Sequence, residues 1–162
     1  VNILSFHRLA KFNKFNSKKF IGSLNKKFMI SKKSRFQNPV KPGDLMIYLN
    51  KSWYSVSLRS DPKIYSKYET DVDIVEKIII KNIANKNQNN SLISVINLPG
   101  LSVHKKLMKE VDSRRADIGF FICPMPMKKI MSIADRGKTV PKKSTYFDPK
   151  PADGLVNLLM DI

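Results

Sequence analysis

The segment from residue 117 to residue 122, Asp-Ile-Gly-Phe-Phe-Ile, constrains the fold of this chain more than any other. After the aspartate, every residue is apolar or glycine, so the segment has no face suited to water. Such a run is typical of a strand that other elements cover on both sides. Pro124 and Pro126 lie just beyond it and end it, because proline cannot donate a hydrogen bond to a sheet. The sequence therefore predicts a strand that is buried on both faces.

Hydrophobic periodicity predicts further helices and strands before and after this strand. The expected order is β-α-ββ-α-β-α-β-α-loop-β, in a single α+β (mixed α/β) domain of residues 1–162 whose helices pack on a mixed sheet. Strands are expected at residues 3–9, 45–49, 53–58, 92–96, 117–122 and 154–159, and helices at residues 17–28, 71–83, 102–111 and 126–134. Residues 31–43 and 59–70 are expected to form loops, and residues 50–52 the turn of a β-hairpin.

Two of these helices carry specific expectations. Ser102 is expected to cap the helix at 102–111, because a serine hydroxyl can accept from the first free amides of a helix. Pro126 is expected to be the first residue of the last helix, since its missing amide is not needed there. Apolar spacing places the inner face of that helix on Met127, Ile130, Met131 and Ala134.

The net charge of +17 suggests an anionic partner. Residues 1–68 hold 15 of the 30 lysines and arginines but only two of the 13 acids. Lysine accounts for 24 of the 30 cations, and arginine, the better fork for bases and phosphates, is scarce. An AT-rich coding sequence would also favour lysine, so the charge fits either a function or codon bias. Nonspecific attraction to polyanions at low salt is expected in both cases.

A membrane partner and a cysteine-based metal site are not indicated. No uninterrupted apolar run approaches the roughly 18 residues of a membrane helix. Cys123 is the only cysteine, so no disulfide can form within the chain, and a lone thiol is typical of a cytoplasmic protein. The only histidines are His7 and His104, and the sequence contains no nucleotide-binding glycine loop or histidine-based metal motif. No catalytic residue is assigned from spacing alone.

The segment 140–150, Val-Pro-Lys-Lys-Ser-Thr-Tyr-Phe-Asp-Pro-Lys, has a proline near each end. The prolines stiffen the backbone, and the residues between them bring ammonium and hydroxyl groups close together. Such a loop suits a small anionic ligand such as a phosphate or a carboxylate. The alternative is a structural brace, in which Tyr146 and Phe147 fix the loop to a core.

The second half of the chain resembles the C-terminal signature of a large bacterial and archaeal family that was first catalogued as domain of unknown function ten-fifteen. The strongest resemblance is Pro141-Lys142-Lys143-Ser144-Thr145-Tyr146-Phe147-Asp148-Pro149-Lys150, which is similar to the family pattern proline, any residue, Lys-Ser-Thr-Tyr-Phe, any residue, Pro-Lys. Supporting resemblances lie at residues 111–121, 124–126, 130, 134–137 and 154–156, in the strand Ile3-Leu4-Ser5-Phe6-His7-Arg8-Leu9, and at Asp71-Val72-Asp73-Ile74. The resemblance covers nearly the whole chain in the right order.

The family is linked to ParB-like folds and to kinases that phosphorylate free serine with ADP or ATP. The resemblance therefore implies a phosphotransferase that uses such a nucleotide with Mg²⁺. It implies a substrate- and phosphate-binding loop formed by Lys143, Ser144, Thr145 and Lys150, with His7 and Arg8 nearby.

The chain also departs from the family pattern. The family's Asp-Gly-His-His-Arg motif, expected before the strand at 3–9, is absent, and Ser5-Phe6 replaces the usual Pro-Thr. The resemblance thus implies the C-terminal part of a longer protein, without activity on its own.

Two other functions stay open. The cations of residues 11–67 could make the chain a non-enzymatic module that binds nucleic acid, and this predicts a steep salt dependence. Alternatively, the chain is a structural lobe that the 140–150 segment braces. His7 likewise has two interpretations, a core histidine with satisfied hydrogen bonds or a proton-transfer or anion-binding group at a strand end.

Overall fold

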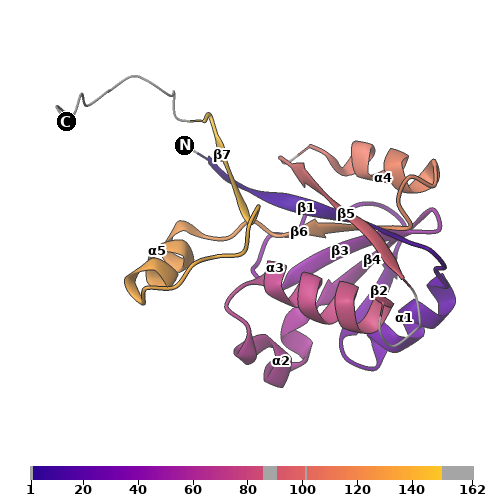
Figure 1. Cartoon of the computed structure of the whole chain (residues 1–162), viewed down its shortest axis with the longest axis horizontal. Helices are drawn as coiled ribbons and strands as arrows, with labels where there is room; N and C mark the ends of the chain where they lie inside the picture. Colours follow the sequence, from indigo (N-terminus) through magenta and orange to yellow (C-terminus); the bar gives the residue numbers. More distant parts are fainter. Residues whose placement is uncertain (1, 86–90, 101, 151–162) are drawn as a thin grey trace, which may run out of the picture.

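The computed structural model describes residues 2–85, 91–100 and 102–150. The strands are β1 (Asn2–Phe12), β2 (Met29–Lys33), β3 (Asp44–Leu49), β4 (Ser52–Ser57), β5 (Leu92–Pro99), β6 (Ile118–Ile122) and β7 (Thr145–Asp148). The helical segments are α1 (Ser17–Asn25), the 3₁₀ turn η1 (Leu58–Ser60), α2 (Pro62–Lys67), α3 (Asp71–Asp73), the π-helical η2 (Ile74–Asn85), α4 (His104–Asp112) and α5 (Met127–Asp135). Helix η2 continues directly from α3 (Figure 1).

The described strands form one sheet in the order β2-β4-β3-β6-β1-β5, and β7 pairs with residues 2–5 of β1. The predicted α+β class is therefore confirmed. The expectation of a mixed sheet is wrong, because every strand pairing in the described part of the chain is antiparallel. The predicted hairpin is present between β3 and β4, and Asn50 and Lys51 both have the positive φ that a tight two-residue turn requires.

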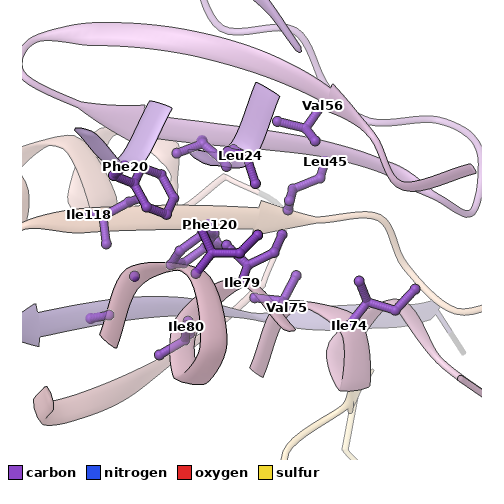
Figure 2. Packing of buried hydrophobic residues seen from close by; sticks show 14 of the residues in the cluster. Phe20, Leu24, Leu45, Val56, Ile74, Val75, Ile79, Ile80, Ile118 and Phe120 are labelled. Atoms are coloured by element: carbon purple, nitrogen blue, oxygen red, sulfur yellow. The ribbon is translucent and has the colours of Figure 1, made fainter. Parts of the chain in front are cut away.

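Strand β6 lies between β3 and β1, and all five of its residues are buried, as the apolar run predicts. Helices α1 and η2 cover one face of the sheet, where Phe20, Ile79 and Phe120 meet in the larger core (Figure 2). Helix α4 covers the other face, where Leu107 and Phe121 belong to a smaller core. The sheet is thus the middle layer of three (Figure 1).

Three segments that were expected to be loops contain regular structure, so the order of elements differs from the expected one. Met29–Lys33 forms the edge strand β2, and Pro62–Lys67 forms α2, which Asp61 caps by accepting from the Ile64 amide. Thr145–Asp148 forms β7, within the segment expected to be a loop. β2 and β7 are strands because each pairs with a strand distant in sequence, and local propensity does not reveal such pairing. The strand predicted at 154–159 lies outside the described residues.

The expected cap of α4 is wrong, and so are the expected start and most of the expected inner face of α5. Helix α4 starts at His104 after Val103, and no side chain caps it, so Ser102 does not. In α5, Pro126 is the N-cap residue, and the buried side chain is Ile133. Met127 and Met131 are 46% and 58% exposed. The cause is the position of α5, which lies beyond the end of the sheet and does not cover one of its faces (Figure 1).

We predict that Gly119→Ala destabilises the fold. A Cβ atom at Gly119 in β6 would lie 2.6 Å from Cγ of Leu107, which is fully buried in α4 and has no room to move. We expect the free energy of unfolding in urea to fall by about 1–3 kcal/mol, the usual cost of overpacking. Gly22→Ala is the matched control, because no atom lies within 4 Å of the added Cβ and α1 should gain roughly 0.5–1 kcal/mol. Equal effects of the two substitutions would contradict this packing.

Candidate functional site

An enclosed cavity of about 180 Å³ lies where β6 ends, at the end of the sheet where α3, α5 and β7 come together (Figure 1). The chain after β6, from Cys123 to Pro126, forms one wall. Tyr65 from α2, Tyr68 just after α2 and the segment from Glu69 to Val72 form another part of the lining. Ser5 of β1 and Ser144, which precedes β7, also line the cavity, together with Pro42, Ile122 and Lys129.

Asp71 is the most buried acid in this lining. Thr70 caps the helix, since its Oγ1 accepts from the Asp73 amide at 3.1 Å, and this leaves the carboxylate of Asp71 free to face other groups. Oδ2 of Asp71 accepts from the Gly43 amide at 2.6 Å. Burial raises the pKa of the Asp71 carboxyl, although the Gly43 hydrogen bond opposes that shift. Asp71 is thus a carboxylate with one oxygen held by the backbone.

Two hydroxyl groups and one thiol lie on the strand side of the cavity. Oγ of Ser144, a residue only 3% exposed, donates to the Pro141 carbonyl at 2.6 Å. Oγ of Ser5 donates to the Cys123 carbonyl at 3.0 Å. Burial raises the pKa of the Cys123 thiol to about 11, so the sulfur is protonated at neutral pH and is a poor nucleophile.

The rim of the cavity holds a cluster of charges that the sequence analysis did not identify. Glu69 accepts from Nη2 of Arg136 at 2.8 Å and from Nζ of Lys138 at 2.7 Å. Nζ of Lys129 lies 3.8 Å from Oε2 of the same carboxylate. The hydrogen bond from Lys138 and the three nearby positive charges lower the pKa of Glu69. One acid therefore faces three cations.

Of the residues predicted to form the anion-binding loop, Ser144 is the one that lines the enclosed cavity. Lys143 lines a shallower hollow together with Glu76 and Asn97, and its Nζ lies 5.4 Å from the centre of the Phe6 ring. Lys150 points its ammonium over the ring of Tyr146, at 5.8 Å.

Thr145 is half-buried in β7, opposite Ser5 of β1. The rings of Phe6 and Tyr146 pack edge to face with 5.9 Å between centres, so the ammonium groups of Lys143 and Lys150 lie over one aromatic pair. They diverge from Ser144, which lines the cavity.

His7 and Arg8 also diverge, because neighbouring residues of a strand point to opposite faces. The ring of His7 stacks on Phe121 with 3.7 Å between centres. Its Nδ1 accepts from the Ile122 amide at 3.0 Å, so Nε2 carries the proton and donates to the Gly100 carbonyl at 2.7 Å. Both ring nitrogens are occupied, which corresponds to the core interpretation of this histidine.

Arg8 does reach the 140–150 segment. Its side chain has no exposed surface, and its Nη2 donates to the Lys142 carbonyl at 3.3 Å. Its Nε forms an ion pair with Oε1 of Glu76 at 2.8 Å, and its Nη1 donates to the Phe6 carbonyl at 2.9 Å. Arg8 therefore joins β1, η2 and the start of this segment, but it does not line the enclosed cavity.

The sequence carried partial signals for the residues that the analysis missed. Asp71 was noted only as a helix start, and Arg136 only as part of a family signature. Nothing in the sequence indicates that Glu69 and Arg136 meet, because 67 residues separate them.

Comparisons of the chain with models of known protein families, with curated proteins and with solved structures find no match. The family resemblance of the 140–150 segment therefore stays a prediction from the residues themselves. In the described ranges, no helix is long and apolar enough to cross a membrane. No three histidine, cysteine or acidic side chains converge as metal ligands there either.

We predict a pH-dependent stability that originates at His7. Burial, opposed by the Gly100 hydrogen bond and assisted by the charge of Arg8, lowers the pKa of His7 to about 4 from its ordinary value of 6.5. The unfolded chain binds a proton here as the pH falls below about 6.5, whereas the folded chain does so only near pH 4. The contribution of neutral His7 to the free energy of unfolding is thus fully present above pH 6.5 and is lost as the pH falls toward about 4. The loss should reach about 3 kcal/mol.

Urea unfolding of the parent chain and of His7→Gln at several pH values between about 7 and 4 measures this contribution. The variant should be less stable at neutral pH and should show a flatter dependence on pH. His104→Gln is the control and should keep the slope of the parent chain. Parallel curves for the parent chain and His7→Gln would show that His7 is not the group responsible.

Proposed function

We propose that this chain is the substrate-binding part of a phosphotransferase related to the free-serine kinases, and that the enclosed cavity receives the small hydroxyl-bearing substrate. The observation that supports this proposal most is the meeting of Asp71 and Ser144 in one cavity. Ser144 belongs to the segment that most resembles the kinase-related family. Asp71 comes from a distant part of the chain and adds a negatively charged carboxylate to the hydroxyl of Ser144.

The size and lining of the cavity fit a small zwitterion. A volume of about 180 Å³ is below the roughly 300–1,000 Å³ of pockets for drug-sized ligands. The carboxylate of Asp71 suits an ammonium group. Ser144 and Thr70 donate their hydroxyl protons to the Pro141 carbonyl and the Asp73 carboxylate, so their oxygens can accept from a ligand hydroxyl. The cations at the rim suit a carboxylate or a phosphate. Free serine and its phosphate ester carry these groups.

Phosphoryl transfer depends mainly on positioning and on neutralisation of charge. In this proposal Asp71 orients the substrate and accepts the proton of its hydroxyl, a role that suits a carboxylate whose pKa is raised by burial. The proposed phosphoryl donor is ADP or ATP with Mg²⁺. The Mg²⁺ would be held mainly by the phosphates of the nucleotide, because both oxygens of Glu69 are engaged by Lys138 and Arg136 and Asp71 is assigned to the substrate. The proposed location is cytoplasmic, in keeping with the free thiol of Cys123.

A second candidate is the non-enzymatic basic module, which binds polyanions through residues 11–67. Of the cations in this range, Lys11 and Arg59 form ion pairs within 4 Å. The other lysines and Arg35 form none in the described part of the chain. These charges are spread over α1, β2 and the loops. Lys32 and Lys33 also have a structural role, because lysines on the edge strand β2 oppose edge-to-edge aggregation. This distribution supports diffuse attraction more than a shaped binding site.

Isothermal titration of the 162-residue chain with L-serine and with O-phosphoserine tests the proposal, because binding requires no missing catalytic group. Asp71→Asn should weaken binding by at least about 10-fold, the usual effect of losing a hydrogen bond to a charged ligand group. Ser144→Ala should weaken it by about 5-fold, the usual effect of losing a hydrogen bond between neutral groups. Lys143→Ala and Lys150→Ala are the matched controls from the same segment. They should change the affinity by less than about threefold, because their ammonium groups act only through screened long-range charge.

Failure of both ligands to bind would remove the substrate-site proposal. If the chain then retains DNA or RNA on a filter at physiological salt, and Asp71→Asn leaves this retention unchanged, the basic-module function would be favoured.

A further inference from the structure

We infer that the three cations on Glu69 form a binding site for the phosphate group of a ligand at the rim of the cavity, and that Glu69 occupies this site when no ligand is bound. The site consists of Lys129 from α5 and of Arg136 and Lys138, which follow that helix. It uses none of the lysines of the 140–150 segment. The inference rests on the proposed function only in taking the enclosed cavity as a ligand site.

Lys129, Arg136 and Lys138 surround the Glu69 carboxylate as cations would surround a bound anion. Both oxygens of Glu69 are engaged, Oε1 by Nζ of Lys138 and Oε2 by Nη2 of Arg136. Lys129 approaches Oε2 only to 3.8 Å, which is beyond hydrogen-bond distance, so its ammonium group keeps capacity for another acceptor. A phosphate has more acceptor oxygens than a carboxylate and would satisfy all three cations.

Charge also favours an additional anion. One carboxylate neutralises one of the three cations, so the cluster keeps a net charge of +2. The side chains are 44–57% exposed for the cations and 32% exposed for Glu69, so a ligand from solvent can reach them. Glu69 and Lys129 themselves line the enclosed cavity. A ligand whose phosphate lies at the rim can therefore extend its remaining atoms toward Asp71 and Ser144.

The cluster could instead be only a clamp that holds α5 against the loop before α3. Burial of Ile133 already provides one apolar contact for α5, and Glu69 adds a charged one. The two roles make opposite predictions for the removal of Glu69. Loss of a clamp would loosen the cations and weaken phosphate binding, whereas loss of a competing anion would strengthen it.

The experiment is therefore titration of the 162-residue chain and of Glu69→Gln with O-phosphoserine, inorganic phosphate and L-serine. Glutamine keeps the size and one acceptor oxygen of Glu69 but removes its charge. We expect Glu69→Gln to bind O-phosphoserine and inorganic phosphate about 3- to 10-fold more tightly, because the competing negative charge is gone. Binding of L-serine should change much less, since serine has no phosphate group. Arg136→Gln should weaken O-phosphoserine binding by at least about 10-fold.

Glu110→Gln is the matched control, because Glu110 forms an exposed ion pair with Arg115 at 2.7 Å, away from the cavity. It should leave all three affinities unchanged, and circular dichroism should show the same helix content in all variants. Weaker or unchanged phosphate binding in Glu69→Gln, with L-serine binding intact, would overturn this inference and leave the proposed function standing. Absence of binding for all three ligands in every variant would overturn both. Equal tightening in Glu110→Gln would show a general effect of net charge and would also overturn the inference.

Discussion

The site depends on the requirement that polar groups buried in a sheet find hydrogen-bond partners. Strand β1 carries two such groups in succession, His7 and Arg8, and each is at most 1% exposed. His7 is satisfied by the Ile122 amide and the Gly100 carbonyl, which places the end of β6 and the end of β5 beside it. Arg8 is satisfied by Glu76 and by the carbonyls of Phe6 and Lys142, which places η2 and the start of the 140–150 segment. Two of these elements reach the cavity, β6 through Ile122 and the 140–150 segment through Ser144.

This arrangement joins two parts of the chain on which the predicted family resemblance rests. The His-Arg pair of β1 and the 140–150 segment are far apart in sequence but joined through Arg8 and the Lys142 carbonyl, and then through the pairing of β7 with β1. Loss of the Arg8 guanidinium would leave Glu76 and two carbonyls without their partner inside the protein. A hydrogen-bond network of this kind favours one arrangement of the chain, and removal of one member strongly lowers the stability of the fold. The segment makes these contacts through its backbone, and Ser144 is the residue that it contributes to the cavity.

The sequence predicted the parts of the fold that follow from local pattern. The apolar run at β6, the hairpin turn at Asn50 and Lys51, and the buried stripe of α1 all lie where hydrophobic periodicity and turn geometry place them. The prediction failed where contact with a distant part of the chain determines the local structure. β2 and β7 are strands because β4 and β1 pair with them, and α5 turns its methionines outward because it lies beyond the sheet.

The predicted site was incomplete for the same reason. Asp71 and Ser144 meet only in the folded chain, and so do Glu69 and the cations near α5. Neighbouring lysines in a sequence also suggest a shared site, yet Lys143 and Lys150 lie over the paired rings of Phe6 and Tyr146 and do not line the cavity. Composition identified an anionic ligand as an attractive partner but could not locate the cations that would hold it.

A crystal structure of this chain with O-phosphoserine tests the central claim most directly. The account predicts density for the ligand in the cavity at the end of β6, with its ammonium group beside Asp71 and its phosphate among Lys129, Arg136 and Lys138. Density for the ligand in the hollow beside Lys142 and Lys143, with an empty cavity, would contradict it.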